Sequence, residues 1–180
     1  AIPAGIRSGG IPLPNTVEAY YKADVSKESD CLKLIQQTVD QFGGLDILVN
    51  NAATTDFLPF ADLSLLTDAH WDRVLQTNVK GPFYCSRAAE LWLKKSKNGG
   101  EIINITSVAG LIGNGSSMAY CASKAALINM TISLARILAP QVRVNSVAVL
   151  STEYSLRQFF VHASKDGQRE SSFSQPACFT

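Results

Sequence analysis

The sequence predicts an α/β fold with a doubly wound parallel sheet, in which helices cover both faces and form three layers. Three short apolar runs, at residues 45–50, 102–106 and 142–148, have the composition of strands that are buried on both faces. The longer segments between them repeat apolar residues at helical spacing. Because strand and helix alternate along the chain, parallel strands joined by right-handed crossovers are the expected arrangement.

The N-terminal part contains an irregular segment and one predicted strand. Residues 1–16 are rich in Gly and Pro and have no period, so we expect a loop or a disordered segment. Residues 17–23 are a predicted strand. Asp24 and Val25 follow at its carboxyl end.

The first predicted helix follows Ser26, a residue type that often caps helix N-termini. Gly43 and Gly44 are expected to end it, since glycine accepts the left-handed conformation at a helix C-terminus. One apolar face is expected, made of Leu32, Ile35, Val39 and Phe42. The second predicted helix is capped by Thr67 and runs to about Lys95.

Pro82 is expected to interrupt the hydrogen bonding of this second helix. Asn78 lies four residues earlier, so its carbonyl would normally accept from the backbone N–H of residue 82, which proline lacks. We expect a kink here and an Asn78 carbonyl that is free to hold a water molecule. A proline kink without a functional role is the alternative.

The third predicted helix is capped by Ser117, runs to about Leu138 and is stopped by Pro140. Tyr120 and Lys124 are four residues apart in it and therefore share one face. With the ammonium about 5 Å from the phenol and an effective dielectric of about 20, the charge favours the phenolate by roughly 3 kcal/mol. That energy lowers the tyrosine pKa by about 2, toward the neutral range in which a general acid/base works best.

Ser107 ends the strand predicted at 102–106 and opens a loop. Its hydroxyl is placed either to bind a substrate carbonyl and stabilise the charge that grows there, or to cap the loop. A nucleophilic serine is not expected, because Gly-x-Ser-x-Gly is absent and neither His70 nor His162 lies in a triad motif. His70, near a helix start, is expected at the surface.

The composition indicates one soluble domain. The chain has 180 residues, 46% of them hydrophobic, which is enough for a core. A net charge of +1 gives no indication of a nucleic-acid partner or an anionic membrane surface. The four cysteines lack the spacing of a metal or redox site. With no secretory signal and no long apolar span, we expect a cytoplasmic protein without a metal.

Five short motifs follow one another in the middle of the chain. They are LDILVNNAA at 45–53, TNVKG at 77–81, IINITS at 102–107, YCASK at 120–124 and VRVNSVA at 142–148. In this order and at these distances the set resembles the short-chain dehydrogenase/reductase family over residues 17–148. The resemblance implies a Rossmann-like fold and hydride transfer between NAD(H) or NADP(H) and a small-molecule carbonyl or alcohol.

The resemblance also implies four catalytic residues. Tyr120 donates or accepts the proton, and Lys124 lowers its pKa and holds the nicotinamide ribose. Ser107 orients the carbonyl, and the Asn78 carbonyl anchors a water of the proton relay. The implied contacts of NAD or NADP are Asp24, Val25, Asn51, Ala52, Ala53, Val79, Tyr120 and Lys124. The family is often oligomeric, so a homo-oligomer is expected of the intact protein.

Some of these positions have simpler explanations or depart from the family. Asp24 is equally explained as an ordinary cap at a strand end. The amides of Asn50 and Asn51 are able to serve backbone groups of their loop. Ala53 stands where the family has glycine and adds a methyl group close to the expected path of the dinucleotide.

The resemblance stops on both sides of residues 17–148. No residue before Asp24 belongs to a Gly-x-x-x-Gly-x-Gly turn, which in the family opens the helix that binds the pyrophosphate. The first two strands and the last strand of the family fold are therefore expected to be missing. Residues 1–16 and 149–180 match nothing in the family, and disorder is one expectation for the tail.

Two interpretations stay open. The chain is part of an NAD(P)-dependent oxidoreductase, or it is a catalytically inactive truncated or frame-shifted product that only self-associates. In either case the strand at 45–50 loses a neighbour and becomes an exposed edge. The substrate stays open, and so does the choice of NAD or NADP, because the residue that selects between them ends a missing strand.

Overall fold

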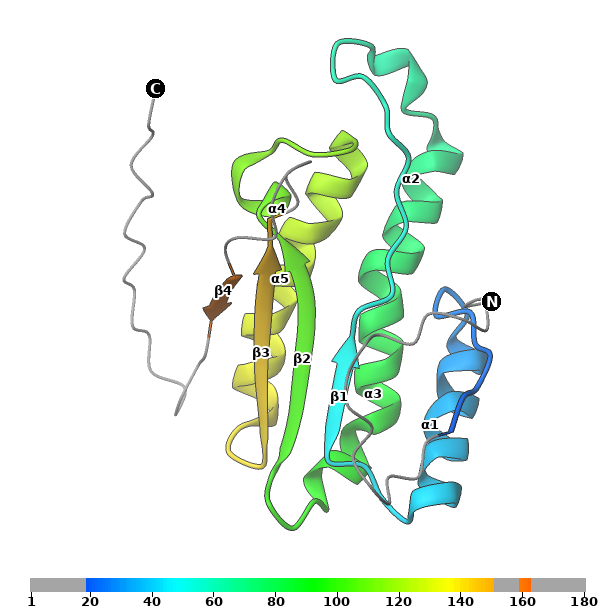
Figure 1. The fold of residues 1–180 in the computed structure, drawn as a ribbon, viewed down its shortest axis with the longest axis vertical. Coiled ribbons are helices and arrows are strands. Elements are labelled where there is room, and N and C mark those ends of the chain that lie inside the picture. Colours follow the sequence, from blue (N-terminus) through cyan, green and yellow to red (C-terminus); the bar gives the residue numbers. More distant parts are fainter. Residues whose placement is uncertain (1–18, 151–158, 163–180) are drawn as a thin grey trace, which may run out of the picture.

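The computed structural model describes residues 19–150 and the backbone of residues 159–162 (Figure 1). The α-helices in this part are α1 (Glu28–Phe42), α2 (Asp68–Leu75), α3 (Gly81–Lys94), α4 (Ala109–Ile112) and α5 (Met118–Leu138). A 3₁₀ turn, η1 (Leu63–Leu65), precedes α2, and a π-helical turn, η2 (Gln76–Lys80), joins α2 to α3. The strands are β1 (Ile47–Asn50), β2 (Gly100–Ser107), β3 (Val142–Val149) and β4 (Phe159–His162).

These strands form one sheet in the order β1-β2-β3-β4. β1, β2 and β3 are parallel, with Val49 opposite Ile103 and Ile103 opposite Asn145. β4 runs antiparallel beside β3. The parallel strands and the helices between them confirm the α/β class.

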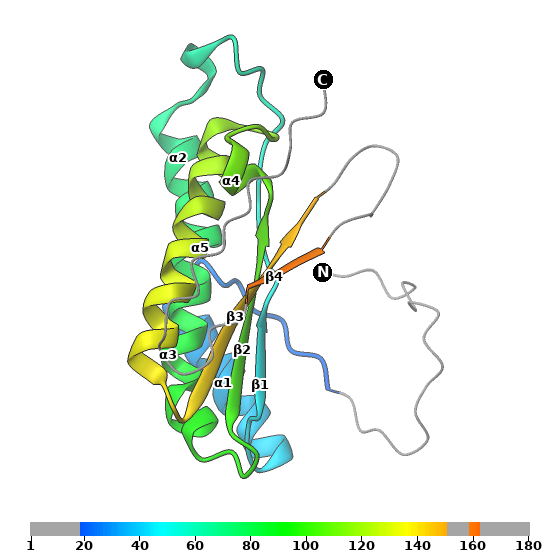
Figure 2. The same ribbon diagram turned by 90° about the vertical axis from the view of Figure 1, so that its left-hand side faces the viewer.

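The helices α1, α2, α3 and α5 all lie on one face of the sheet (Figure 2). From β1 to β3 the chain crosses the sheet in one direction, so two right-handed crossovers place α3 and α5 on the same side. α1 packs beside α3 on that side. The described residues are thus two layers of the expected three-layer arrangement.

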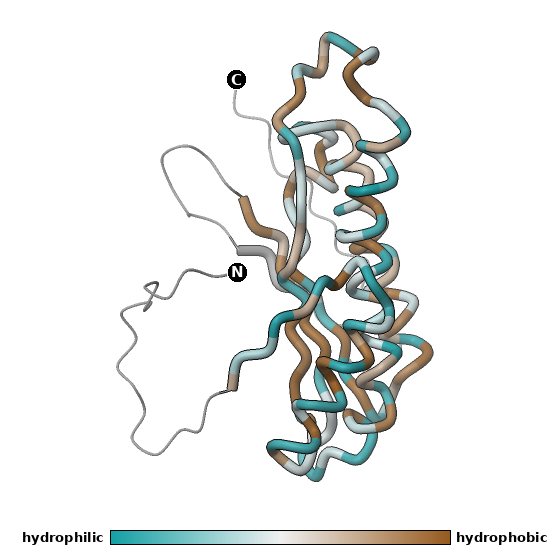
Figure 3. Tube along the Cα trace, turned by 90° about the vertical axis from the view of Figure 1, so that its right-hand side faces the viewer, coloured by the Kyte–Doolittle hydropathy of each residue, from teal (hydrophilic) through white to brown (hydrophobic). Residues whose placement is uncertain are grey.

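The buried core lies between this helical layer and the sheet. It consists of Ile35, Val39, Ala89, Leu93, Ile102, Ala135, Leu138, Val142 and Val144. Figure 3 shows hydrophobic residues concentrated in the strands. Each fully buried Leu, Ile or Val stabilises the fold by about 1.5–3 kcal/mol, so this seam holds the helices to the sheet.

The opposite face of β1 is open. Ile47 and Val49 are 55% and 53% exposed, whereas Leu48, between them, packs against the core. Within the part of the chain that the structure describes, β1 is also an edge strand, as expected. Strand backbone and apolar side chains are therefore both accessible at this edge.

Most helix ends follow the signals in the sequence. Gly43 ends α1 with φ +79°, in the left-handed region that favours glycine. The Thr67 hydroxyl accepts from the His70 N–H at 3.3 Å, and α2 begins at the next residue. The Ser117 hydroxyl caps α5 in the same way.

The predicted start of α1 is wrong by one residue, because the N-cap is Lys27 and not Ser26. The N–H and hydroxyl of Ser26 both donate to Oδ1 of Asp24, at 3.1 and 2.7 Å. These bonds fold residues 24–26 into a turn, so Ser26 does not cap the helix. α1 begins at Glu28, and its N-cap Lys27 makes no side-chain capping bond.

The apolar face of α1 is narrower than expected. Ile35 and Val39 are buried with Cys31, but Leu32 and Phe42 are exposed. α1 is the outermost helix of the layer (Figure 1). Only the side toward α3 and the sheet is covered, and Leu32 and Phe42 lie outside it.

The strand predicted at 17–23 is absent from residues 19–23, which have no regular structure; residues 1–18 lie outside the described part. A strand requires a partner for its backbone. The free side of β1 offers one, but in the described residues β1 pairs only with β2. Residues 19–23 therefore have the composition of a strand but do not form one.

The tail after Ala148 contains regular structure, because β4 lies within it. Its backbone pairs with the outer edge of β3, with Phe159 opposite Val149. Pairing satisfies backbone groups that β3 would otherwise leave open. Residues 151–158 and 163–180 lie outside the described part, so the expectation of disorder there is not addressed.

α5 is long and apolar enough, by length and composition, to cross a membrane, the only such helix among the described residues. No such span was expected from the sequence. Core helices can meet the same criterion. α5 packs against β2 and β3, with Leu127 and Leu138 buried, and we describe it as a core helix.

Candidate active site

The N-terminal turns of α5 carry the candidate acid/base. Ser117 Oγ accepts from the Tyr120 N–H at 3.2 Å and fixes the first turn. Lys124 follows one turn later, and its Nζ lies 5.6 Å from the centre of the Tyr120 ring. Ser107 ends β2 close enough for its hydroxyl to hydrogen-bond the tyrosine side chain. The structure thus brings Ser107, Tyr120 and Lys124 together.

Lys124 is buried and is held by the sheet. The side chain is 3% exposed, and Nζ donates to the Ile105 carbonyl at 2.8 Å. Burial lowers the pKa of Lys124 from its ordinary 10.5 to about 8. An ammonium with three N–H donors and one protein acceptor has room for ligand hydroxyls.

The expected lowering of the Tyr120 pKa is wrong for this structure. Burial raises the pKa of Tyr120 above 10.0, and the hydrogen bond with Ser107 only partly opposes that effect. The spacing correctly placed Lys124 beside Tyr120 but did not indicate that burial removes both groups from water. Desolvation disfavours both charged forms.

Ser107 serves its own loop as well as the tyrosine. Its hydroxyl donates to the Val149 carbonyl at 3.3 Å and accepts from the Ala109 N–H at 3.1 Å. The capping role and the position beside the phenol are therefore compatible. These bonds hold Oγ at the carboxyl end of β2.

Asn78 is almost completely buried, 1% exposed, at the π-helical turn η2. Its side-chain amide binds both backbone groups of Thr54, at 2.8 and 2.9 Å, and donates to Ser123 Oγ at 3.0 Å. Ser123 in turn donates to the Tyr120 carbonyl at 2.7 Å. The side chain therefore joins α5 to the loop after β1.

The helix irregularity expected at Asn78 is present. In η2 the Gly81 N–H donates to the Gln76 carbonyl, five residues back, instead of four. Such turns are frequent at functional sites and change the direction of nearby carbonyls. Pro82 still has no N–H for the Asn78 carbonyl.

A second group of predicted residues lines a cavity of about 190 Å³ at the carboxyl end of β1. Val25, Asn51 and Ala52 are on its wall, together with Gly81 and Pro82. A Cβ at Gly81 would lie 3.0 Å from Val25 Cγ2 and 3.1 Å from the Val25 carbonyl, so any larger residue here would require Val25 to move by a few tenths of an ångström. Asp24, Ala53 and Val79 are not on the wall.

Asp24 forms a turn with Ser26 and is not the strand-end cap of its simpler explanation, because residues 19–23 form no strand. Its carboxylate accepts from Ser26 and lies 3.6 Å from Lys27 Nζ. The hydrogen bonds from Ser26, more than the charge of Lys27, lower the pKa of Asp24. The side chain is exposed beside α1.

The side chain of Asn50 joins the carboxyl end of β1 to β2 and α3. Its amide donates to Asn104 Oδ1 at 2.8 Å and to Ser86 Oγ at 3.2 Å, not to loop backbone. Asn104 donates onward to Thr131 Oγ1 at 2.9 Å. These buried hydrogen bonds tie β1 and β2 to α3 and α5. In the sequence, their signal was a polar residue inside each apolar strand, Asn50 and Asn104.

His70 is not at the surface, contrary to expectation. It is 6% exposed. Its Nδ1 lies 2.8 Å from Asp56 Oδ2, and its Nε2 lies 3.3 Å from Ser117 Oγ. Nothing local in the sequence indicates these contacts, because they come from residues 14 and 47 positions away.

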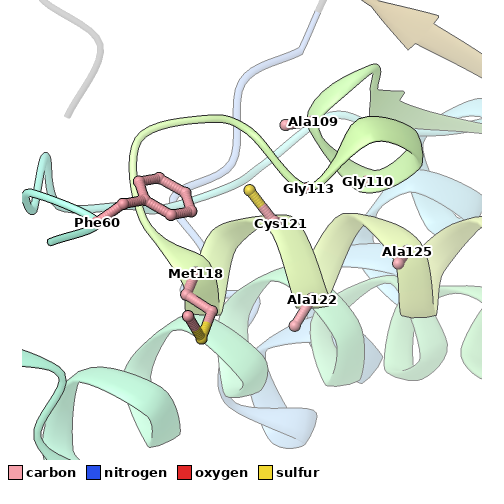
Figure 4. A pocket seen from close by; sticks show the side chains of 8 residues that line it. All are labelled: Phe60, Ala109, Gly110, Gly113, Met118, Cys121, Ala122 and Ala125. Atoms are coloured by element: carbon pink, nitrogen blue, oxygen red, sulfur yellow. The ribbon is translucent and has the colours of Figure 1, made fainter. Parts of the chain in front are cut away.

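A separate apolar cavity of about 340 Å³ lies between α4, α5 and Phe60 (Figure 4). Met118, Cys121, Ala122 and Ala125 line it from α5, and Tyr120 does not. Burial raises the pKa of the Cys121 thiol. We assign no chemistry to this cavity. No group of three or more His, Cys, Asp or Glu among the described residues is arranged to hold a metal.

Known proteins are similar to this chain in both sequence and fold. A protein named as ketoacyl reductase 2 of the granaticin polyketide synthase of Streptomyces violaceoruber is 41% identical over 136 residues, which are 76% of this chain and 53% of that protein. An NAD+-bound xylitol dehydrogenase has a TM-score of 0.65 at 34% identity, over 72% of this chain and 49% of its own. ElxO with NADP bound has a TM-score of 0.66 at 31% identity, over 72% and 52%.

The chain spans about half the length of these relatives. The family model described as short chain dehydrogenase matches residues 15–161. That range contains the five motifs, the helix of Tyr120 and Lys124, and the cavity beside β1. The chain belongs to the short-chain dehydrogenase family.

Proposed function

We propose that the chain carries the acid/base half of an NAD(P)-dependent oxidoreductase that acts on a small-molecule carbonyl or alcohol. The observation that carries the proposal is the grouping of Ser107, Tyr120 and Lys124 at the carboxyl end of β2. Ligands of open parallel sheets bind at this end of the strands. The names of the relatives, which include a ketoacyl reductase and a xylitol dehydrogenase, support this reaction class.

The residues present fit a dinucleotide in two places. The cavity wall is apolar at Val25 and Ala52 and polar at Asn51, and the backbone at Gly81 approaches it closely. Lys124 has N–H donors to spare and lies next to the tyrosine, as a ribose-binding group must. The bound structures of two relatives, one with NAD+ and one with NADP, support either cofactor.

Tyr120 is the proposed acid/base. A bound nicotinamide supplies or accepts the hydride. As a carbonyl is reduced, its oxygen gains negative charge, and the phenol of Tyr120 gives it a proton. The Ser107 hydroxyl, near the same phenol, would turn its hydrogen from the Val149 carbonyl to the substrate oxygen and stabilise that charge.

The proton lost by Tyr120 must be replaced. Lys124, whose Nζ lies 5.6 Å from the centre of the Tyr120 ring, stabilises the phenolate when both are charged and is the proposed source of a proton that passes through water. The Asn78 carbonyl, which Pro82 cannot bond, is the proposed anchor of that water. The remaining bonds of Asn78 keep this part of η2 against α5.

The proposal is tested with ethyl acetoacetate, a small β-ketoester, and NADH or NADPH. The whole protein should oxidise the reduced nicotinamide only when the ketoester is present, as measured by loss of nicotinamide absorbance. Cofactor binding without turnover of ethyl acetoacetate, of simple ketones or of secondary alcohols in the reverse direction would contradict it.

The alternative, an inactive product that only self-associates, is supported by the open edge of β1 but not by the relatives. The two differ in dinucleotide binding by the whole protein, which only the first requires. We also propose a cytoplasmic homo-oligomer. Exposed apolar side chains on α3 and α5, such as Leu91 and Ile137, support the association, and the lack of paired cysteine spacing agrees with the compartment.

A further inference from the structure

His70 occupies a buried position between two oxygen partners. Asp56 Oδ2 is 2.8 Å from Nδ1, and Ser117 Oγ is 3.3 Å from Nε2. Arg73 binds the same carboxylate. Asp56 comes from the loop after β1, His70 from α2 and Ser117 from the N-cap of α5. The ring therefore joins three separate segments.

The hydrogen bonds specify which ring nitrogen carries the proton. An ionised carboxylate only accepts, so Nδ1 of His70 must donate to Asp56. Ser117 Oγ accepts from the Tyr120 N–H and keeps its own hydrogen, which it can donate to Nε2 of a ring protonated on Nδ1. Every group is then satisfied by a neutral ring with its proton on Nδ1.

This chain of bonds ends at the backbone of the candidate acid/base. From Asp56 it passes through His70 and Ser117 to the N–H of Tyr120. A second contact runs beside it, between the hydroxyls of Thr55 and Ser116 at 2.5 Å. The Leu58 N–H, in the same loop, also donates to the Ser116 carbonyl at 2.8 Å. The loop after β1 and the start of α5 are therefore held together at three points.

The order Asp, His, Ser also occurs in hydrolases, but Ser117 is not placed for attack on a substrate. It is 1% exposed, and its Oγ is committed to the Tyr120 N–H and to the ring. A nucleophile needs an accessible oxygen. The geometry points instead to an effect on the residue that Ser117 caps.

We propose that His70 is a positioning residue: held by Asp56, it fixes Ser117 and with it the first turn of α5, so that the Tyr120 phenol stays at the place of proton transfer. This inference rests on the proposed function, because the position of the Tyr120 phenol matters only if that phenol transfers the proton. A misplacement of a reacting group by about 1 Å can cost on the order of 100-fold in rate.

The bond pattern is measured first, without any variant. The sequence has two histidines, so ¹⁵N-histidine labelling gives two sets of ring signals, and His70→Gln assigns those of His70. Solid-state NMR reads the tautomer in any association state. At mildly alkaline pH we expect a protonated Nδ1 and an unprotonated Nε2. A His70 ring with its proton on Nε2 would overturn the proposal.

Two amide variants then separate positioning from simple packing. In His70→Asn the short amide can still donate to Asp56 but cannot reach Ser117, whereas the longer amide of His70→Gln can accept from Ser117. In the whole protein we expect kcat to fall by about 10-fold to 100-fold in His70→Asn with KM within about twofold, and His70→Gln to recover most of the loss. Equal kcat in both variants would overturn the proposal.

Matched aspartate variants test the other end. Asp56→Ala should lower kcat as His70→Asn does. Asp62 lies in the same segment of chain between β1 and α2, and its carboxylate caps η1 by accepting from Ser64. Asp62→Ala removes this cap and should leave kcat unchanged. A similar fall in both variants would show a general effect of the loop and would overturn the assignment to His70.

The two proposals fail in different ways. If Tyr120→Phe keeps full turnover, the proposed function is wrong. The positioning proposal is judged separately, by the amide and ring NMR signals of Tyr120, which should shift in His70→Asn and return in His70→Gln. Unchanged Tyr120 signals in His70→Asn would overturn it whatever the turnover of Tyr120→Phe.

Discussion

Lys124 holds its ammonium 5.6 Å from the centre of the Tyr120 ring but gives its hydrogen bond to the carbonyl of Ile105, at 2.8 Å. The two side chains are neighbours without a direct bond. Burial moves the pKa of Tyr120 upward and that of Lys124 downward, so both shifts favour the neutral forms. For the proposed acid/base role, the pair needs the polar contacts that ligand and water would add.

The first prediction concerns stability. The buried charge of Lys124 costs the fold on the order of 3 kcal/mol, from the difference between about 8 and 10.5 in pKa. Lys124→Met removes this cost but leaves the Ile105 carbonyl without its bond, so a net gain of about 1–2 kcal/mol in unfolding free energy is expected at neutral pH. Chemical denaturation measures it.

The pH dependence of this gain is specific. The folded-state pKa of Lys124 lies below the unfolded value, so the unfolded chain binds more protons between about 8 and 10.5. The advantage of Lys124→Met is therefore full below about pH 8, falls as the pH rises, and becomes a deficit near 10.5, where only the loss of the bond to the Ile105 carbonyl remains. The exposed Lys97→Met is the control, and an equal gain there would refute the burial argument.

The second prediction concerns catalysis. Tyr120→Phe removes the proton donor and should lower kcat of the whole protein by about 10²–10⁴-fold. Cofactor affinity should change much less, because Lys124 keeps its position. Tyr21→Phe is the control, since the Tyr21 hydroxyl binds the Gln37 carbonyl in α1, remote from the site. Normal turnover in Tyr120→Phe would remove the tyrosine from the mechanism.

The third prediction concerns η2. Pro82→Ala supplies an N–H for the Asn78 carbonyl, so the π-helical turn should shorten toward α-helix and withdraw the proposed water anchor. We expect little loss of stability but a lower kcat. Hydrogen exchange at the new alanine amide reports the added bond. Protection of that amide together with unchanged kcat would exclude a role for the Asn78 carbonyl.

The fourth prediction concerns the 180 residues by themselves. They should bind neither NAD nor NADP in calorimetric titration, because the sequence has no Gly-x-x-x-Gly-x-Gly turn to hold the pyrophosphate. They should also self-associate through the β1 edge, where Ile47 and Val49 are exposed. Micromolar binding of either dinucleotide by a monomer would contradict both expectations.

A charged edge tests the route of this association. Val49→Lys should shift the chain toward monomer in sedimentation, because a lysine at an exposed edge opposes strand pairing. Ile137→Lys, at a similarly exposed position on α5, is the matched control. If Ile137→Lys disperses the oligomer and Val49→Lys does not, the contact is made by the helices.

Local signals in the sequence were sufficient for most of the fold. Gly43, Thr67 and Ser117 mark helix ends by interactions within a few residues, and these are confirmed. Ser26 fails because a second local pattern competes: Asp24 accepts its N–H and hydroxyl first. The strand at 17–23 fails over its described part because pairing is not a local property.

The site was predictable where it depends on spacing and not where it depends on environment. A four-residue interval placed Tyr120 and Lys124 on one face of α5. Neither that interval nor the residue types reveal how far both are removed from water, which decides the direction of their pKa shifts. The burial of His70 depends on Asp56 and Ser117, and no periodicity in α2 indicates either.

The one-sided helical layer has a consequence for engineering. All crossovers from β1 to β3 turn the same way, so a continuous stretch of chain carries a complete layer of helices together with the proposed proton-transfer residues. A doubly wound sheet can thus be divided along the chain into two pieces that differ by face. We expect such pieces to suit a split reporter: each would be silent when expressed alone, and reunion across the β1 edge would restore the proposed reaction.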